Sequence, residues 1–178
     1  MIRPILTDGH PLLRKVAPPV NLLEIPGPMI QGLLRDMMET MHAAHGIGLA
    51  APQIGSPLRL VVMGNVKADG GARGFPARVL INPVLLSQTT TILQTNREGC
   101  LSVPGWCGDV ARPLGLEVQY LDEKGATQRV KMNGLEAACL LHEADHLDGI
   151  LFIDKLEGEK IAQPRLVARP EFERPEGQ

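Results

Sequence analysis

The chain has 178 residues and a formal net charge of -2, and 44% of its residues are hydrophobic but only 3% are aromatic. This length predicts one compact globular domain, and the near-neutral charge argues against nucleic-acid binding, which usually needs a clustered basic face. No apolar run reaches the roughly 18–20 residues that span a bilayer, and prolines and charges interrupt the N-terminus where a signal peptide would be continuously apolar. We therefore expect a cytoplasmic protein with no membrane partner.

The cysteines are an odd number in a chain without signs of secretion, so a disulfide framework is not expected. A cysteine with a special role would then be a metal ligand or a nucleophile. The plain alternative is that each is a small, buried hydrophobic side chain. The three are Cys100, Cys107 and Cys139.

Apolar residues recur at helical spacing from Ile30 to Ala44, and this stretch begins after Pro28 and closes at Gly46. The pattern predicts an amphipathic helix in the N-terminal part of the chain. After a glycine-rich stretch, the runs 58–63 and 79–86 are short, rich in Val, Ile and Leu, and flanked by Gly, Pro or Asn. They predict two strands.

Residues 115–132 alternate apolar and polar side chains on either side of the turn 122–125, which predicts a β-hairpin. The period then becomes helical up to Gly149, with Asn133 placed to cap the helix and Glu136 placed to complete a capping box. One face of this helix carries Leu135, Ala138, Cys139, His142 and His146.

Hairpins with few helices, and no regular β-α-β alternation, predict an α+β fold. We expect mixed or antiparallel β-sheets around the helix 134–149, with the amphipathic helix near the N-terminus. Residues 1–162 are predicted to form a single domain. Residues 163–178 are rich in proline and charge and are predicted to be a loosely ordered tail.

The most informative segment is HEADH at 142–146. On a helix, His142 and His146 lie one turn apart and can converge on one metal ion, with Glu143 beside them. This spacing is typical of metal-dependent hydrolases. The alternative is a solvated helix face with two surface histidines.

A catalytic site of this kind needs a third protein ligand and an open position for water. Cys139 lies about 10 Å along the helix axis from His146, too far to share one ion comfortably. Phe152 stands where a third histidine would continue the motif. Glu157 and Glu159 follow too soon in the chain to come from a separate returning helix.

The best upstream candidate is Cys100, because Gly99 allows close backbone approach and a strand-like run precedes it. A thiolate with two imidazoles suits zinc or ferrous iron. The competing upstream ligands are His10, His42 and His45.

Three segments together, GIGLAAPQ at 46–53, EGCLS at 98–102 and HEADH at 142–146, resemble the motifs of the peptide deformylase family in order and separation. The resemblance covers about residues 3 to 156. It implies removal of the formyl group from the N-terminal formylmethionine of newly made proteins, with release of formate. It also implies Cys100, His142 and His146 as ligands of one divalent metal, Fe2+ first, with Zn2+, Ni2+ and Co2+ as alternatives.

The same resemblance implies that a water activated by the metal attacks the formyl carbonyl. Glu143 becomes the general base and acid. The Gln53 side-chain amide and the Leu101 backbone N–H become donors to the oxyanion.

The expected partners are N-formylmethionyl peptides of nascent chains, with transient ribosome contact and no specific nucleic-acid sequence. Glycines in the first motif let an extended peptide approach the backbone, as in strand addition. Apolar residues, Ala138 among them, are expected to form a slot for the methionine side chain. The predicted substrate-binding residues are Gly46, Ile47, Gly48, Gly99, Leu135 and Cys139, and simple core packing is the alternative for the apolar ones.

Some residues depart from the family pattern or extend it. Leu141 stands where many family members have glutamine, and Arg112 resembles the arginine that pairs with the acidic residue of the second motif, Glu98. Trp106 either shapes the pocket rim or packs in the core, and Cys107 has no assigned role.

Two other functions compete with deformylation. An endopeptidase would use the same histidines and glutamate with a third ligand other than Cys100. A metal-binding module without catalysis would need neither Gln53 nor Glu143, because a structural site fills all four positions with protein ligands.

Overall fold

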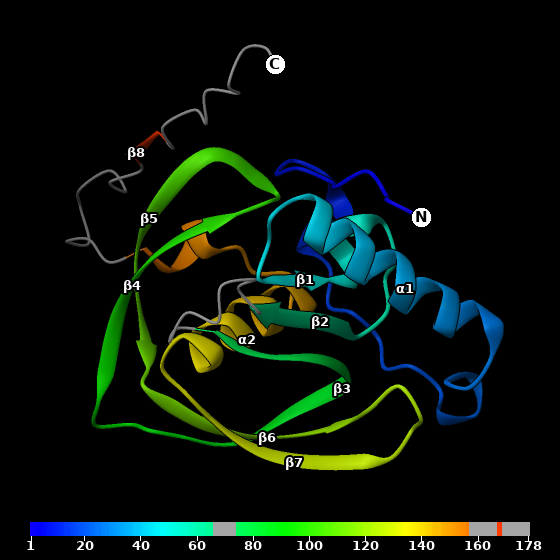
Figure 1. The fold of residues 1–178 in the computed structure, drawn as a ribbon. Coiled ribbons are helices and arrows are strands. Elements are labelled where there is room, and N and C mark those ends of the chain that lie inside the picture. Colours follow the sequence, from blue (N-terminus) through cyan, green and yellow to red (C-terminus); the bar gives the residue numbers. More distant parts are fainter. Residues whose placement is uncertain (66–73, 157–166, 169–178) are drawn as a thin grey trace, which may run out of the picture.

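The computed structural model describes residues 1–65, 74–156 and 167–168. The described chain forms helices and antiparallel sheets, which confirms the predicted α+β class (Figure 1). The elements in chain order are η1 (Pro11–Arg14), η2 (Leu22–Glu24), α1 (Pro28–Ala43), β1 (Gly48–Ala50), η3 (Ala51–Ile54), β2 (Leu60–Asn65), β3 (Phe75–Gln88), β4 (Leu93–Cys100), β5 (Val103–Pro113), β6 (Gly115–Leu121), β7 (Thr127–Asn133), α2 (Gly134–Leu147), η4 (Phe152–Lys155) and β8 (Val167–Ala168).

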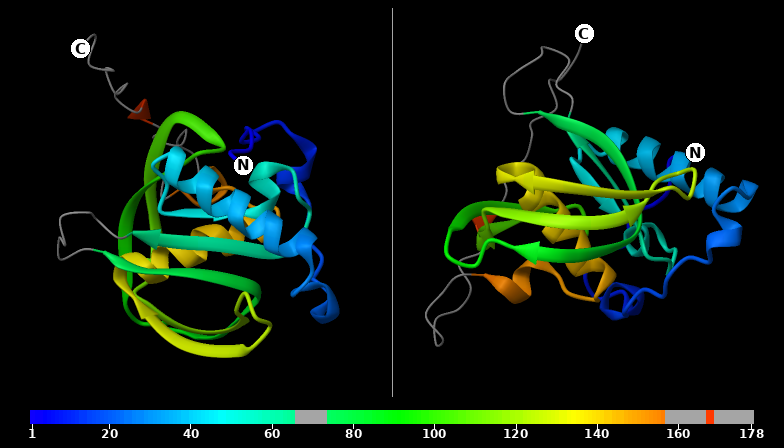
Figure 2. Two further views of the ribbon diagram at one scale, coloured as in Figure 1. Left: turned by 45° about the vertical axis from the view of Figure 1, so that its right-hand side comes forward. Right: turned by 90° about the horizontal axis from the view of Figure 1, so that it is seen from below.

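Two sheets surround α2. One has the strand order β1-β2-β3-β6-β7 and the other β4-β5-β8, and every pairing is antiparallel. Figures 1 and 2 show α2 in the middle of the molecule, with α1 on the far side of β1 and β2. The helix that carries the HEADH motif is therefore central, as predicted.

The apolar run on β2 reflects burial on both faces. Val61 and Met63 pack in the cluster that includes α2, whereas Leu60 and Val62 pack in the cluster that includes α1. Successive strand residues point to opposite faces, so a strand covered by helices on both sides has no polar face. This arrangement holds β1 and β2 firmly between the two helices.

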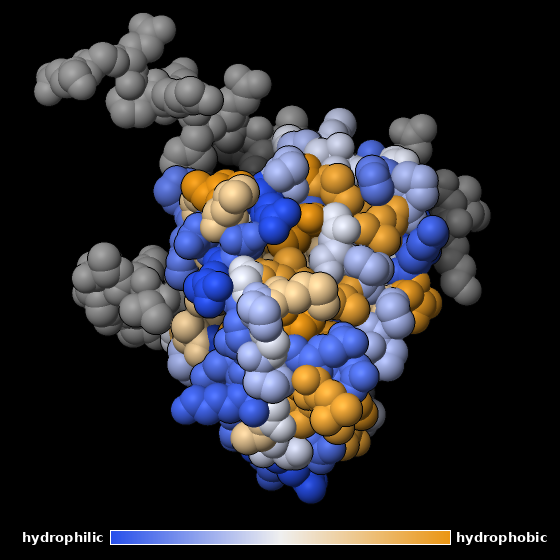
Figure 3. Space-filling view, turned by 90° about the vertical axis from the view of Figure 1, so that its right-hand side faces the viewer, coloured by the Kyte–Doolittle hydropathy of each residue, from blue (hydrophilic) through white to orange (hydrophobic). Residues whose placement is uncertain are grey.

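Helix α1 matches its prediction closely. Pro28 occupies its first turn, and the buried side chains Ile30, Leu34, Met37 and Met41 form one stripe. At its end His45 adopts a left-handed backbone conformation with φ of 53°. Figure 3 views the side of the molecule on which α1 lies, where hydrophobic groups are separated by hydrophilic ones.

The start of α2 differs from its prediction. Asn133 is at the N-cap position, but its side chain makes no capping hydrogen bond. Glu136 instead forms an ion pair with Arg78 on β3, at 3.0 Å. The predicted capping box is therefore wrong, because a tertiary partner competes for the carboxylate.

Strands β4 and β5 extend well beyond the strand-like run that the sequence indicates before Cys100. In β4 only Glu98 and Cys100 are buried, so most of the strand has no continuous apolar face. Its order comes from pairing with β5, in register from Leu93 opposite Pro113 to Gly99 opposite Cys107. Pairing of this kind leaves little trace in hydrophobic periodicity.

The predicted tail, residues 163–178, lies outside the described residues except for Val167–Ala168. That short strand pairs with β5 at Trp106 and Cys107. Among the helices that the structure describes, none is long and apolar enough to cross a membrane.

Candidate metal centre

Cys100, His142 and His146 converge at the centre of the molecule. Their ligand atoms all lie within 4.8 Å of one another, and the Cys100 Sγ atom is 3.1 Å from His146 Nε2. The histidines come from successive turns of α2, and the cysteine ends β4 where the β4–β5 register shifts after Gly99. Such a shift re-aims a side chain. The structure thus brings together the three residues that the sequence selected as ligands.

The competing ligands do not join them. Within the described residues, the grouping of potential metal ligands contains only these three side chains. His10 caps η1, where its Nδ1 accepts a hydrogen bond from the Leu12 N–H at 3.2 Å. Glu157 and Glu159 lie outside the described residues.

A buried chain of charges orients His142. Its Nδ1 atom lies 2.7 Å from Glu98 Oε2, and Arg112 donates to both Glu98 oxygens at 2.6 and 2.8 Å. Arg112 also reaches Asp145 at 2.6 Å, and Asp145 in turn accepts from Lys155 at 2.6 Å. Because Nδ1 is engaged, Nε2 of His142 is left to face the cluster.

Electrostatics keep Glu98 ionised. Burial by itself raises the pKa of Glu98, but the hydrogen bonds from Arg112 and His142 outweigh it and bring the pKa from 4.5 to about 2. The predicted Glu98–Arg112 pair is thus present, and it extends through Asp145 to η4.

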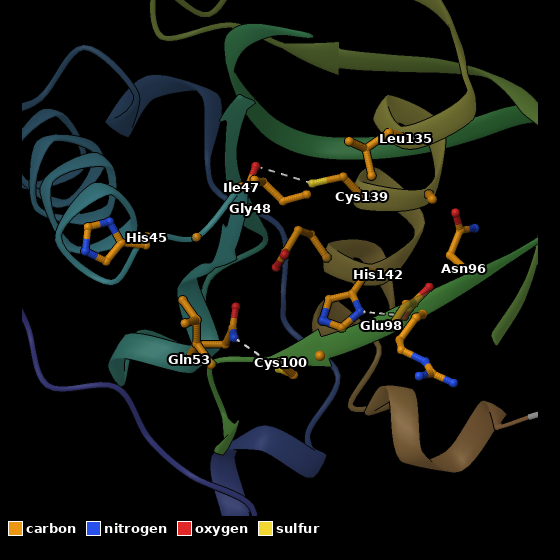
Figure 4. A pocket seen from close by; sticks show the side chains of 16 residues that line it. His45, Ile47, Gly48, Gln53, Asn96, Glu98, Cys100, Leu135, Cys139 and His142 are labelled. Carbon is orange, nitrogen blue, oxygen red and sulfur yellow. Dashed lines mark hydrogen bonds and ion pairs between the residues drawn. The ribbon is translucent and has the colours of Figure 1, made fainter. Parts of the chain in front are cut away.

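Gln53 lies beside the cluster on η3 and is almost fully buried. Its Oε1 accepts from the Ala50 N–H at 2.8 Å, which points Nε2 towards Cys100 Sγ at 3.6 Å and Ser102 Oγ at 3.2 Å (Figure 4). Leu101 follows Cys100 directly and lines the same pocket. Both predicted oxyanion donors are therefore next to the thiol.

Glu143 is 4% exposed and its Oε2 has no hydrogen-bond partner among the described residues. Burial raises the pKa of Glu143 from 4.5 to about 7, against the opposing effect of His142. A β-carbon at Gly48 would lie 2.4 Å from Glu143 Oε1 and 2.8 Å from Cys139 Sγ. The first motif thus needs glycine at position 48 so that β1 can pass close to this carboxylate.

The residues present fit a divalent transition metal. One thiol and two imidazoles are the donors that such ions prefer, and Fe2+, Zn2+, Ni2+ and Co2+ all accept this set. In the described structure, two buried side-chain atoms lack hydrogen-bond partners, His146 Nδ1 and Glu143 Oε2. His146 offers its other nitrogen, Nε2, to the cluster, so the Nδ1 atom says nothing about an ion. Glu143 Oε2 lies in the pocket beside the cluster, and a buried carboxylate oxygen without a partner is rare enough that a further group is expected next to it.

A pocket of about 330 Å³ opens beside the cluster. The Cys139 thiol closes one wall by donating to the Ile47 carbonyl oxygen at 3.4 Å. Leu135 is 41% exposed and lies at the mouth of the pocket. The buried residues of α2 begin after it, at Ala137. The lining includes every predicted substrate-binding residue, namely Gly46, Ile47, Gly48, Gly99, Leu135 and Cys139, as well as Ala138.

Sequence analysis missed Asn96 and Arg97 as lining residues, and it considered His45 only as a competing metal ligand. All three lie within two residues of a motif, and that proximity is the only signal that could have revealed them. Trp106 is 45% exposed and is absent from the lining, so it neither shapes the pocket nor packs in the core. Leu141 is buried in the cluster between α2 and the larger sheet.

Residues 2–162 match the sequence profile of the family described as polypeptide deformylase. The chain is 43% identical over 156 residues to the peptide deformylase of Mesorhizobium japonicum, covering 87% of this chain and 84% of the relative. Among solved structures, it is similar to a peptide deformylase from Legionella pneumophila, with a TM-score of 0.77, 40% identity, and coverage of 88% and 87% of the two chains. It is also similar to a Met-Ala-Ser-bound class I type b peptide deformylase from Acinetobacter baumannii, with a TM-score of 0.82, 32% identity, and coverage of 87% and 99%.

Proposed function

Since the chain belongs to the polypeptide deformylase family and is a peptide deformylase, a metal-dependent hydrolase, we propose how its own residues release formate from N-formylmethionyl peptides. One observation carries the proposal. The Cys100, His142 and His146 ligand atoms converge beside a pocket that also contains the buried carboxylate of Glu143.

Cys100, His142 and His146 are the proposed metal ligands, and Fe2+ is the proposed ion, with Zn2+, Ni2+ and Co2+ as alternatives. When bound, such an ion supplies a Lewis acid that lowers the pKa of water towards neutrality. Glu98 holds His142 in the orientation that directs Nε2 to the ion.

Glu143 is the proposed general base and acid. It lies in the pocket next to His142, and its Oε2 has no competing partner among the described groups, so it is free to take a proton from water. The same carboxyl group then donates that proton to the amine that leaves. No other carboxylate lining the described pocket is available, because Glu98 is held by Arg112.

Gln53 and the Leu101 backbone N–H are the proposed oxyanion donors. The Ala50 N–H fixes the Gln53 amide, so its Nε2 is oriented before substrate arrives. Donors fixed in advance stabilise developing charge without reorganisation, which is the source of their catalytic effect.

The proposed peptide site follows β1. Within the described residues, this strand is at the edge of the five-stranded sheet and β2 is its one partner, so a substrate can add along its other edge. The methionine side chain would enter the slot formed by Ile47, Leu135 and Cys139. The A. baumannii relative binds Met-Ala-Ser, a peptide that begins with methionine.

Formylated nascent chains are thus the proposed substrates, and the cytoplasm is the proposed compartment. Transient contact with the ribosome is part of the proposal. Co-sedimentation of the full chain with ribosomes tests that contact.

The decisive test is formate release. Protein loaded anaerobically with Fe2+ should release formate from a formyl-Met peptide, and Glu143→Gln should abolish turnover while keeping the metal. Cys100→Ser should lower metal occupancy. Absence of formate with iron, nickel, cobalt and zinc alike contradicts the proposal, and internal cleavage of unformylated peptides would favour an endopeptidase.

A further inference from the structure

His45 has an unusual backbone conformation. In the part of the chain that the structure describes, only two residues other than glycine have positive φ, His45 at 53° and Asn82 at 52°. The Asn82 side chain accounts for its own conformation, because it bonds to the Val20 N–H at 2.8 Å and to the Val20 carbonyl oxygen at 2.9 Å. The described structure contains no such bond for the His45 imidazole.

The turn that holds His45 would favour glycine. The His45 N–H donates to the His42 carbonyl oxygen at 3.0 Å, and the Gly46 N–H donates to the Met41 carbonyl oxygen at 2.9 Å. This pair of bonds is the Schellman motif, whose left-handed residue is usually glycine. A β-carbon there strains the backbone. His45 therefore holds a backbone conformation in which glycine would be less strained than histidine.

His45 stands at the outer end of the peptide site. It is exposed and lines the pocket, directly before Gly46. Figure 4 shows its ring at the end of the segment that carries Ile47 and Gly48, away from Cys100. Non-glycine residues in strained conformations cluster at functional sites.

The direction of a bound peptide brings it to this ring. β1 runs from Gly48 towards η3, where Gln53 points at Cys100. A peptide that adds antiparallel to β1 with its formyl group near Gln53 therefore continues past Gly46. Its second and third residues leave the pocket beside His45.

We propose that His45 is a specificity-determining residue whose imidazole hydrogen-bonds the peptide downstream of the formylmethionine. Loss of the imidazole then lowers kcat/KM for extended formylated peptides more than kcat/KM for formylmethionine amide. This inference rests on the proposed function. A competing role is purely structural, since an imidazole at the C-terminus of α1 interacts favourably with the helix dipole.

The test measures the ratio of kcat/KM for formyl-Met-Ala-Ser to kcat/KM for formylmethionine amide. Thermal unfolding is measured on the same variants. In His45→Gly the ratio should fall about two- to tenfold, as expected for one lost hydrogen bond, while the melting temperature rises by about 1–3 °C because the strain is removed. His45→Ala keeps the strain but removes the imidazole. It should lower the ratio equally without raising the melting temperature.

Asn82→Gly is the matched control. It should lower the melting temperature, because its hydrogen bonds to Val20 are lost, and leave the substrate ratio unchanged. An unchanged ratio in His45→Gly, or a reduced ratio in His45→Gly but not in His45→Ala, overturns the inference. An unchanged ratio together with a fall in the melting temperature of His45→Gly assigns His45 the helix-dipole role instead. If the wild-type protein releases no formate from either compound, the proposed function itself fails.

Discussion

Replacing Arg112 by methionine tests the buried charge chain most directly. The guanidinium is 3% exposed and joins two carboxylates, Glu98 and Asp145. Methionine has a similar length but no charge, so Arg112→Met leaves Glu98 buried with only His142 beside it. Asp145 keeps its ion pair with Lys155 at 2.6 Å.

The size of the effect follows from the pKa of Glu98. A pKa of about 2 instead of 4.5 corresponds to about 3 kcal/mol in favour of the carboxylate, shared between Arg112 and His142. Breaking a buried ion pair by removing one partner typically costs about 3–5 kcal/mol. We therefore expect Arg112→Met to lower the free energy of unfolding by about 3–5 kcal/mol at neutral pH. Because the pKa is lowered in the folded state, this stabilisation is present above pH 4.5 and is lost as pH falls towards 2.

The assay is urea unfolding of chelator-treated protein, because a bound ion adds its own stabilisation. A double-mutant cycle with Glu98→Gln isolates the pair. The double variant should lose much less stability than the sum of the two single variants. A loss below about 1 kcal/mol in Arg112→Met, or strict additivity in the cycle, would refute the reasoning.

Three further predictions follow from the site and the hairpin. Gly48→Ala should lower kcat about 100-fold and also lower the melting temperature, because the new β-carbon would lie 2.4 Å from Glu143 Oε1 and 2.8 Å from Cys139 Sγ and must displace them in a buried site; unchanged turnover would contradict this. Chelation should lower the melting temperature, because metal binds only the folded chain, and added Zn2+ should restore it; a melting temperature that chelation does not change counts against a metal site. Asp122→Ala should lower the urea midpoint at pH 7, because Asp122 accepts the Lys124 and Ala126 N–H groups and its pKa is lowered. That contribution is present above pH 3.8 and disappears as pH falls through the lowered pKa, so the variant and the wild type should converge there.

Local sequence determined the parts of the site that lie on single elements. The spacing of His142 and His146 fixes two ligands on one helix face, because a helix repeats nearly every four residues. The apolar runs of α1 and β2 likewise predict their own burial. The third ligand, Cys100, was the best of several candidates from its sequence context, and the fold placed it with the histidines.

Only the tertiary structure decided which distant groups meet. Glu136 pairs with Arg78 instead of capping α2, and the polar strand β4 is ordered by its partner β5. The contact between Asp145 and Lys155, and the place of His45 in the pocket, likewise depend on how elements pack. Periodicity records which way a side chain faces along its own helix or strand. Which charge it then meets depends on strand register and on the packing of elements far apart in the chain, and that pairing leaves no repeat in the sequence.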